Sequence, residues 1–257
     1  MFNATEFTYA GIYSGLYGLK IASMSSSVVE NTSHATPTIS SAKPAKGGKF
    51  FLQDAKYTSA PTYSFSIVSE TPIPEPIQRE VMNWLNLRKE YKILKIHQAE
   101  FEEYDYRCIF HITQTIYHAG QCVGYTLQAT FDSIYQYGHP TKKVVTGTGV
   151  SQDVSISNLS DCVDEYIYPT VEFNTNDGTI SIINKTDSAT REFSFTGLAP
   201  NTTYVVDNEL KTIEGGTNVL SKFSKKWLRL LAGKNQLSIR VNGTVKIICP
   251  HYAKIKF

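Results

Sequence analysis

The residue types that could do chemistry in this sequence begin with four carboxylates, Glu100, Glu102, Glu103 and Asp105. Two carboxylates that face each other across a sugar can hydrolyse a glycosidic bond. These four lie between two predicted strands, and no second acidic group is evident to face them. We therefore expect a solvated acidic loop and no catalytic residue, and the chain is not expected to be an enzyme.

Histidine and cysteine are the next candidates, because both bind metal ions. His97, His111 and His118 could supply three zinc ligands, but strand alternation predicts His111 on a polar face and His118 in a turn. The four cysteines are Cys108, Cys122, Cys162 and Cys249. Because they show no Cys-x-x-Cys pair and no close Cys–His spacing, we expect free thiols that pack as small hydrophobic residues, with no metal and no cofactor.

A basic run surrounds Trp227, and its members are Lys222, Lys225, Lys226 and Arg229. One interpretation is an aromatic platform with basic neighbours, on which a sugar or a base could stack. The other, which the pattern favours, is a strand with a buried Trp and a charged outer face.

The composition favours a β-rich protein of one large or two ordinary domains. The 257 residues are 41% hydrophobic and 19% charged, and 16 Tyr and 13 Phe compare with 3 Met; aromatic residues suit the half-buried surface of a sheet. The net charge is only +2, without the basic stripe that indicates nucleic-acid binding. No secretory signal or membrane-spanning run is evident, so we expect a protein made in a reducing compartment.

One amphipathic helix is predicted in a chain that otherwise alternates as strands. It covers residues 77–88 and follows the proline-rich segment 72–76. Four apolar residues share one of its faces: Ile77, Val81, Trp84 and Leu85. Such a helix must bury this face against a sheet. Residues 104–131 then predict a long antiparallel hairpin with its turn at 117–121.

The remaining segments predict an ordered division of the chain. Residues 23–48 are rich in Ser, Thr, Ala and Lys and cannot bury enough surface to order themselves alone. Residues 138–149 lack periodicity and form the best candidate boundary, and Gly147-Thr148-Gly149 within them is interpreted as a linker, because the third glycine and the helix of a phosphate loop are missing.

Beyond residue 149 the pattern predicts short strands of a β-sandwich. Turns are predicted at residues 176–178 and at Asn242-Gly243, which is a favoured hairpin pair. Residues 227–231 are predicted to be one of the strands.

The order of these elements resembles the distal tail protein family of long-tailed bacteriophages. In the first half the match is carried by Phe7-Thr8-Tyr9-Ala10-Gly11-Ile12, Tyr17-Gly18-Leu19, the strand 63–68 leading to the helix with Trp84-Leu85, and the hairpin 104–131. In the second half it is carried by Gly197-Leu198, residues 204–208, Trp227-Leu228 and the Gly-x-Asn turn in Gly233-Lys234-Asn235-Gln236-Leu237.

The resemblance implies a mainly β fold of two domains. Residues 1–140 would form a tail-tube-like β-sandwich or split barrel with one helix, and residues 141–257 a galectin-like β-sandwich. Residues 23–50 would form an arm that reaches a neighbouring subunit, with Phe50 and Phe51 as contact residues. The charged pair that the family carries near the glycines of the arm is not evident at Gly47-Gly48, so the register of the arm stays open.

The resemblance also implies a structural role. Six copies would form a ring between the distal end of the tail tube and the baseplate or tail tip, leaving a channel for DNA. The implied partners are other copies of the chain, the major tail tube protein, a tail-associated baseplate hub protein and a receptor-binding protein, with DNA passing only transiently and no membrane. The protein would be assembled in the host cytoplasm and located in the virion.

In this reading the polar face of the hairpin is expected to line the channel, through Arg107, His111, Thr126, Gln128 and Thr130. The alternative is a carbohydrate-binding or adhesin module, in which Trp227 or Tyr204 of the second domain stacks on a host cell-wall sugar.

Overall fold

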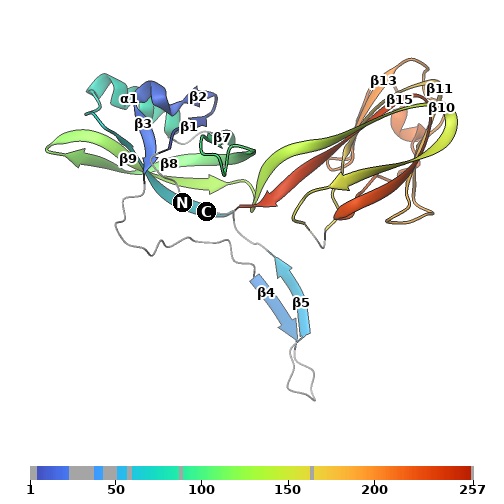
Figure 1. Ribbon diagram of the computed structural model, residues 1–257, viewed down its shortest axis with the longest axis horizontal. Helices are drawn as coiled ribbons and strands as arrows, with labels where there is room; N and C mark the ends of the chain where they lie inside the picture. The colour runs from blue at the N-terminus through green and yellow to red at the C-terminus, as the bar shows by residue number, and fades with distance from the viewer. Residues whose placement is uncertain are drawn as a thin grey trace. The chain divides into compact units, whose positions relative to one another are not determined.

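The computed structural model describes residues 5–22, 38–42, 51–56, 60–86, 89–162 and 165–255. The chain divides into two compact units, one of residues 1–136 with 254–257 and the other of residues 137–253. Both consist mainly of β-strands, as predicted, and α1 (Glu75–Leu85) is the one α-helix in the described part of the chain (Figure 1).

The N-terminal unit is built around one antiparallel sheet. Besides α1 its elements are β1 (Phe7–Tyr9), β2 (Ile12–Tyr13), the 3-10 helix η1 (Ser14–Tyr17), β3 (Leu19–Ala22), β6 (Thr62–Ser69), β7 (Lys92–Ile96), β8 (Tyr104–His118) and β9 (Gln121–Phe131). The strands follow the order β3-β6-β9-β8-β7-β1-β2. Thr5, just before β1, pairs with Ile21 of β3 through two backbone hydrogen bonds of 2.7 and 3.1 Å. This bridge joins β3 to the start of β1, so the sheet closes as a split barrel.

The helix α1 covers this sheet as its apolar pattern requires, and Figure 1 shows it beside β1 and β3 on one face of the β8–β9 hairpin. Pro74 caps its N-terminus and Pro76 lies in its first turn, where a missing N–H costs nothing. Trp84 is buried, stacks on Phe7 with ring centroids 5.7 Å apart, and donates from Nε1 to the Tyr9 carbonyl at 2.8 Å. The predicted helix is therefore confirmed, although it begins and ends slightly earlier than expected.

A separate two-stranded ribbon interrupts this unit. It pairs β4 (Thr38–Ala42) with β5 (Phe51–Lys56), and neither strand joins another described strand. The strand β4 lies inside the segment predicted to be an arm, and Phe51 begins β5, where it pairs with Ala42. Phe50 and Gly47-Gly48 lie outside the described residues.

The C-terminal unit is built around three long strands, β10, β11 and β15. Its elements are β10 (Tyr135–Asn158), β11 (Thr170–Asn184), β12 (Glu192–Phe195), β13 (Thr203–Asp207), β14 (Thr212–Glu214), the 3-10 helix η2 (Val219–Lys222) and β15 (Gly233–Lys254). The order is β14-β13-β11-β15-β10. The first half of β11 also pairs with β13 and its second half with β12. Because β11 pairs with β15 on its other edge, it has neighbouring strands on both sides.

Two predicted turns are wrong, because the strands continue through them. Residues 176–178 form a bulge within β11, between Thr175 and Ile180, and Asn242-Gly243 lies inside β15 with Gly243 opposite Thr175. Gly178 and Gly243 have φ of +72° and +142°. A bulge and a hairpin turn both use the positive φ that glycine adopts readily, so the same residues serve either structure.

Two further predictions are wrong, one of a linker and one of a strand. Residues 147–149, expected to be a Gly-Thr-Gly linker, lie in the continuous strand β10; the division after residue 140 stays a prediction, and the two compact units divide after residue 136. Residues 227–231 are not a strand, apart from a bridge between Leu230 and Ile167. Leu228 and Leu230 are buried there, but the Leu228 N–H donates to the Asn208 side chain at 2.8 Å rather than to a neighbouring strand.

Candidate functional site

The predicted channel-lining residues lie on the face of the β8–β9 hairpin opposite the core. Arg107 and His111 are exposed, and Thr126, Gln128 and Thr130 are half-buried. His111 pairs directly with Gln128 across the two strands. The other face is buried through Tyr106, Cys108, Phe110, Leu127, Ala129 and Phe131. The alternation predicted for the hairpin is therefore confirmed, while a position on the wall of a channel stays a prediction.

The pairing of β8 and β9 becomes less regular toward the tip of the hairpin. Its register shifts between Ile112 and Gln114 and again between Ile116 and Tyr117, and Tyr117 is 64% exposed. His111 Nδ1 lies 3.3 Å from Oδ1 of Asn86, the residue that ends α1. The hairpin is thus attached to the covering helix at its middle and extends as a ribbon beyond it.

The candidate carboxylates and histidines are surface residues. Glu100, Glu102 and Glu103 are exposed, and Asp105 forms an ion pair of 3.1 Å with Lys95. His97 Nε2 lies 2.7 Å from Thr8 Oγ1. No group of His, Cys, Asp and Glu among the described residues could hold a metal ion. No helix in the described stretches has the length and apolar character needed to cross a membrane.

All four cysteines are free and buried, as predicted. Burial raises the pKa of the Cys249 thiol to about 12 and that of the Cys108 thiol still further above its ordinary value. Because the thiolate is the reactive form, both residues stay protonated and inert at neutral pH. They act as small hydrophobic side chains of the two cores.

The two aromatic residues considered for sugar stacking have different surroundings. Tyr204 is 1% exposed, and its hydroxyl accepts a hydrogen bond from the Ala199 N–H at 3.1 Å. Its ring therefore has no face available to a sugar. Trp227 is half-buried and outside any strand, so the prediction of a buried strand Trp is wrong.

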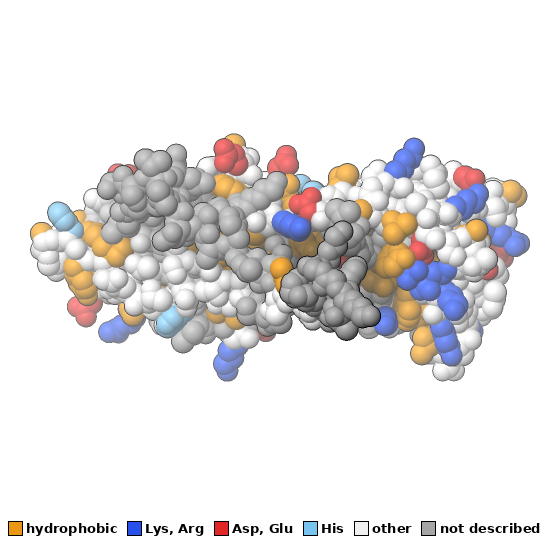
Figure 2. Space-filling model, turned by 90° about the horizontal axis from the view of Figure 1, so that it is seen from below, with side chains coloured by type: hydrophobic (Ala, Val, Ile, Leu, Met, Phe, Trp, Pro, Cys, Tyr) orange, Lys and Arg blue, Asp and Glu red, His pale blue; other side chains and the backbone are white. Residues whose placement is uncertain are grey.

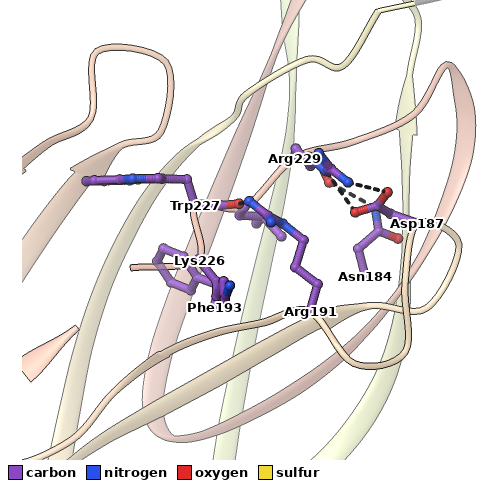
Figure 3. A pocket seen from close by; sticks show the side chains of 8 residues that line it. Asn184, Asp187, Arg191, Phe193, Lys226, Trp227 and Arg229 are labelled. Atoms are coloured by element: carbon purple, nitrogen blue, oxygen red, sulfur yellow. Dashed lines mark hydrogen bonds and ion pairs between the residues drawn. The ribbon is translucent and has the colours of Figure 1, made fainter. Parts of the chain in front are cut away.

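Trp227 lies beside a charged cluster that the sequence does not reveal (Figure 3). Arg229 donates to both carboxylate oxygens of Asp187, from Nε at 2.9 Å and from Nη2 at 3.1 Å. Arg191 donates from Nη2 to the Trp227 carbonyl at 3.1 Å. Asp187 and Arg191 come from the turn after β11, about forty residues before Arg229, and no motif or spacing in the sequence points to their meeting.

The ion pair decides the protonation of Asp187. Burial by itself raises the pKa of this carboxyl group, but hydrogen bonds from Arg229 and Tyr166 hold the pKa below its ordinary value. The Arg229 guanidinium also lies 3.8 Å from the centroid of the Tyr166 ring, a cation–π distance. Arg229 is thereby fixed on two sides.

Basic side chains are unevenly distributed on the surface. Figure 2 shows Lys and Arg side chains gathered on the visible face of the C-terminal unit, with few Asp and Glu between them. Because the net charge of the whole chain is only +2, this concentration is local.

Comparison with known proteins assigns the chain to a protein family. Residues 2–133 match a family model described as a phage tail protein N-terminal domain, and residues 135–249 match one described as a phage tail C-terminal domain. No curated protein matches the sequence. Among solved structures, the Dit protein (gp 19.1) of phage SPP1 is similar over 97% of this chain and 99% of that chain, with a TM-score of 0.71 and 13% identity.

The SPP1 protein is described as a paradigm of the hub adsorption apparatus in phages that infect Gram-positive bacteria. At 13% identity the likeness concerns the fold, and it includes both domains. The N-terminal and C-terminal family matches follow each other along the sequence and together cover nearly the whole chain. The chain therefore belongs to a family of phage tail proteins and has the fold of a distal tail protein.

Proposed function

We propose that six copies of this chain form a ring that joins the distal end of a phage tail tube to the baseplate or tail tip. The observation that supports this most directly is the similarity to a phage hub protein over nearly all of both chains. Residues 1–140 would build the ring, and residues 141–257 would form the second domain. The chain acts as a structural component, without catalysis and without a cofactor.

The β4–β5 ribbon is the proposed arm between subunits. A two-stranded ribbon is marginally stable by itself in water, and this one pairs with no other described strand. The side chain of Ile39 on β4 is 65% exposed. An unpaired strand edge with an apolar side chain can pair with another chain, and a head-to-tail contact of this kind closes into a ring when the rotation allows it.

The polar face of the β8–β9 hairpin is the proposed wall of the channel. Its hydroxyl, amide and imidazole groups carry little fixed charge apart from Arg107. Phosphate contacts dominate protein affinity for DNA, so a wall with few cations lets DNA pass without retaining it. The exposed positions of Arg107 and His111 agree with this role.

The proposed partners follow from the position in the tail. They are neighbouring copies, the major tail tube protein, the tail-associated hub protein of the baseplate and a receptor-binding protein, with DNA present only in transit. The protein would be assembled in the host cytoplasm and become part of the virion. Of the two aromatic residues considered for a carbohydrate-binding role, Tyr204 is buried and gives that role no support, and Trp227 is half-buried.

The ring is tested by light scattering after size exclusion, with and without the tail tube protein, and by negative-stain images. The expected particle has about six times the chain mass of 28.8 kDa and a central opening. A monomer under every condition, with no ring in images, would refute the proposal.

The channel wall is tested in the same particles with Gln128→Cys labelled by maleimide-gold. The native cysteines are buried, so the label should report the new thiol. Gold inside the opening is expected, and gold at the periphery contradicts the assignment. Lys226→Cys, an exposed position of the C-terminal unit, serves as the control and should place gold away from the opening.

A further inference from the structure

An exposed apolar turn lies on the surface of the N-terminal unit, at the 3-10 helix η1. Leu16 is 74% exposed, more than any other large hydrophobic side chain in the described part of the chain, and Tyr13, which precedes η1, is 40% exposed. The Tyr13 ring lies over Gly15 and leaves no room there for a Cβ. The exposed side chains of Tyr13 and Leu16 therefore flank Gly15 and form one apolar surface, here called the η1 surface.

The turn that carries Leu16 is held in place by the core of the unit. The hydroxyl of Ser14, which is fully buried, accepts a hydrogen bond from the Phe7 N–H at 3.0 Å. The Tyr17 ring packs against the Trp84 ring of α1, with centroids 5.4 Å apart. Because a rigid contact surface loses little conformational freedom on binding, the η1 surface is prepared for a partner.

The β4–β5 ribbon is another apolar element of this unit. Its two strands contain three large apolar residues, Ile39, Phe51 and Leu52, and the Ile39 side chain is 65% exposed. The ribbon pairs with no other described strand, and two strands alone are marginally stable in water. It therefore gains stability from an apolar surface on another part of the assembly.

The ribbon is able to reach a neighbouring copy. Six residue steps join Lys56, the end of β5, to Thr62, the start of β6, and they span at most about 20 Å when fully extended. The ribbon, with strands of five and six residues, adds about 15–20 Å. A unit of this size has a radius of gyration of about 14 Å. The reach of the ribbon therefore exceeds the radius of the unit that carries it.

We propose that the β4–β5 ribbon of each copy docks on the η1 surface of the neighbouring copy, with Ile39 against Leu16. This inference rests on the proposed ring, in which each copy gives one ribbon and receives one. The strand β2, which ends at Tyr13, pairs with β1 alone among the described strands. Because an unpaired strand edge accepts another strand, the backbone of the ribbon finds a partner beside the η1 surface.

The η1 surface also leaves the proposed channel free. Figure 1 shows β1, β2, β3 and α1 together on one face of the β8–β9 hairpin, and the polar face proposed as the channel wall is the opposite one. Another exposed apolar residue of the unit, Ile93, pairs with Arg107 of that polar face. A ribbon bound at Ile93 would cover the wall, whereas a ribbon bound at Leu16 braces the ring from outside.

The docking is tested by cross-linking the full chain that carries Leu16→Cys and Ile39→Cys together, after the particles have formed. The four native cysteines are buried, so a short bismaleimide should react with the two new thiols. A ladder of linked chains, up to six, is expected on a denaturing gel. In the matched control Leu210→Cys takes the place of Leu16→Cys, because Leu210 is 73% exposed but belongs to the C-terminal unit. The control should give no ladder.

The outcomes separate the docking site from the ring itself. Particles that are rings by light scattering, but whose chains are linked only within themselves or no more than in the control, would overturn the docking site and leave the ring intact. A stronger ladder with Tyr117→Cys, at the exposed hairpin tip, in place of Leu16→Cys would also overturn it. A native chain that forms no ring would refute the ring and the docking together.

The stability of the ring gives a second measurement. Leu16→Gln should raise at least about tenfold the concentration at which half of the rings dissociate, because loss of a central apolar anchor weakens an interface strongly. Leu16→Met keeps an apolar side chain and should retain most of the stability, and Leu210→Gln should have no effect. Circular dichroism should show an unchanged fold, since Leu16 is exposed. Equal losses in Leu16→Gln and Leu210→Gln would overturn the assignment of the η1 surface.

Discussion

The side-chain amides of Asn184 and Asn235 are joined by a hydrogen bond of 2.9 Å, from Asn184 Nδ2 to Asn235 Oδ1. Asn235 Oδ1 also accepts from the Leu231 N–H at 2.9 Å, and Asn235 Nδ2 donates to the carbonyls of Leu231 and Gly233 at 2.8 and 3.1 Å. Asn235 is fully buried. The Gly-x-Asn motif, predicted to be a turn, is the start of β15; the four hydrogen-bonding positions of its asparagine are all used, and it joins the end of β11 to the start of β15.

Asn235→Ala should lower the free energy of unfolding of the C-terminal unit by about 2–4 kcal/mol, because it leaves several buried polar groups unpaired. Urea denaturation followed by the fluorescence of Trp227 measures the change, in a Trp84→Phe background that removes the other Trp. Lys234→Ala, at the exposed neighbouring position, should shift stability by less than about 0.5 kcal/mol. A loss of similar size in both variants would contradict the role given to Asn235.

Trp84→Phe should destabilise the N-terminal unit by about 1–2 kcal/mol, because the ring is retained but the Nε1 donor to the Tyr9 carbonyl is lost. Trp84→Ala should cost about 3–5 kcal/mol, since it also opens a cavity next to Phe7. Thermal unfolding followed by circular dichroism measures both changes. Met82→Ala, on the exposed side of α1, is the control and should have little effect.

Gly243→Ala should destabilise the C-terminal unit by more than Gly233→Ala. Both glycines have positive φ, +142° and +81°, so each substitution introduces backbone strain of about 1 kcal/mol or more. A Cβ at Gly243 would also lie 2.3 Å from the Asn174 carbonyl oxygen, whereas one at Gly233 meets nothing within 4 Å. Comparing the denaturation midpoints of the two variants separates steric contact from strain, and equal midpoints would refute the close approach of β11 and β15.

The stability of the C-terminal unit should fall in acid partly through Asp187. Its pKa in the folded protein lies below the ordinary value of 3.8, so the ion pair contributes fully above that value and is lost as the pH falls through the folded pKa. Asp187→Asn should lower stability at pH 7 and flatten the decline between about pH 5 and pH 3. Denaturation midpoints across this range measure the effect.

The exposed pair of Asp153 and Lys185 gives the control for that pH series. The hydrogen bond from Lys185 also lowers the pKa of Asp153, but the Asp153 side chain is 63% exposed and solvent weakens the pair. Asp153→Asn should therefore change stability and its pH dependence less than Asp187→Asn. The reverse order would mean that the buried pair is not the more important of the two.

Replacing residues 23–59 by a short Gly-Ser linker should abolish ring formation while leaving the N-terminal unit folded. The strands β3 and β6 are antiparallel neighbours, with Ala22 opposite Ser66, so a short linker can join them. Light scattering measures the mass and circular dichroism the fold. Rings of unchanged size would contradict the role of the arm, and an unfolded protein would contradict the independence of the barrel.

The sequence by itself determined the local elements of this protein. The hairpin of β8 and β9 and the helix α1 are predictable because their side chains repeat with the periods of a strand and a helix, and because their turn and proline signals lie next to them in the chain. The burial of Cys108, Cys122 and Cys249, which lie in β8, β9 and β15, follows from the same alternation. The resemblance to distal tail proteins rests on these local segments and is confirmed by the family and the fold.

Only the tertiary structure decided where strands continue, where the sheet closes and which charges meet. The Asn and Gly residues near 176 and 242 suit a turn and a bulge equally, and the choice of a bulge depends on β11 and β15 lying side by side. The bridge of Thr5 to Ile21 closes the barrel, and Arg191 meets Trp227 across the C-terminal unit. Such contacts join residues far apart in the chain, so no local period or spacing encodes them.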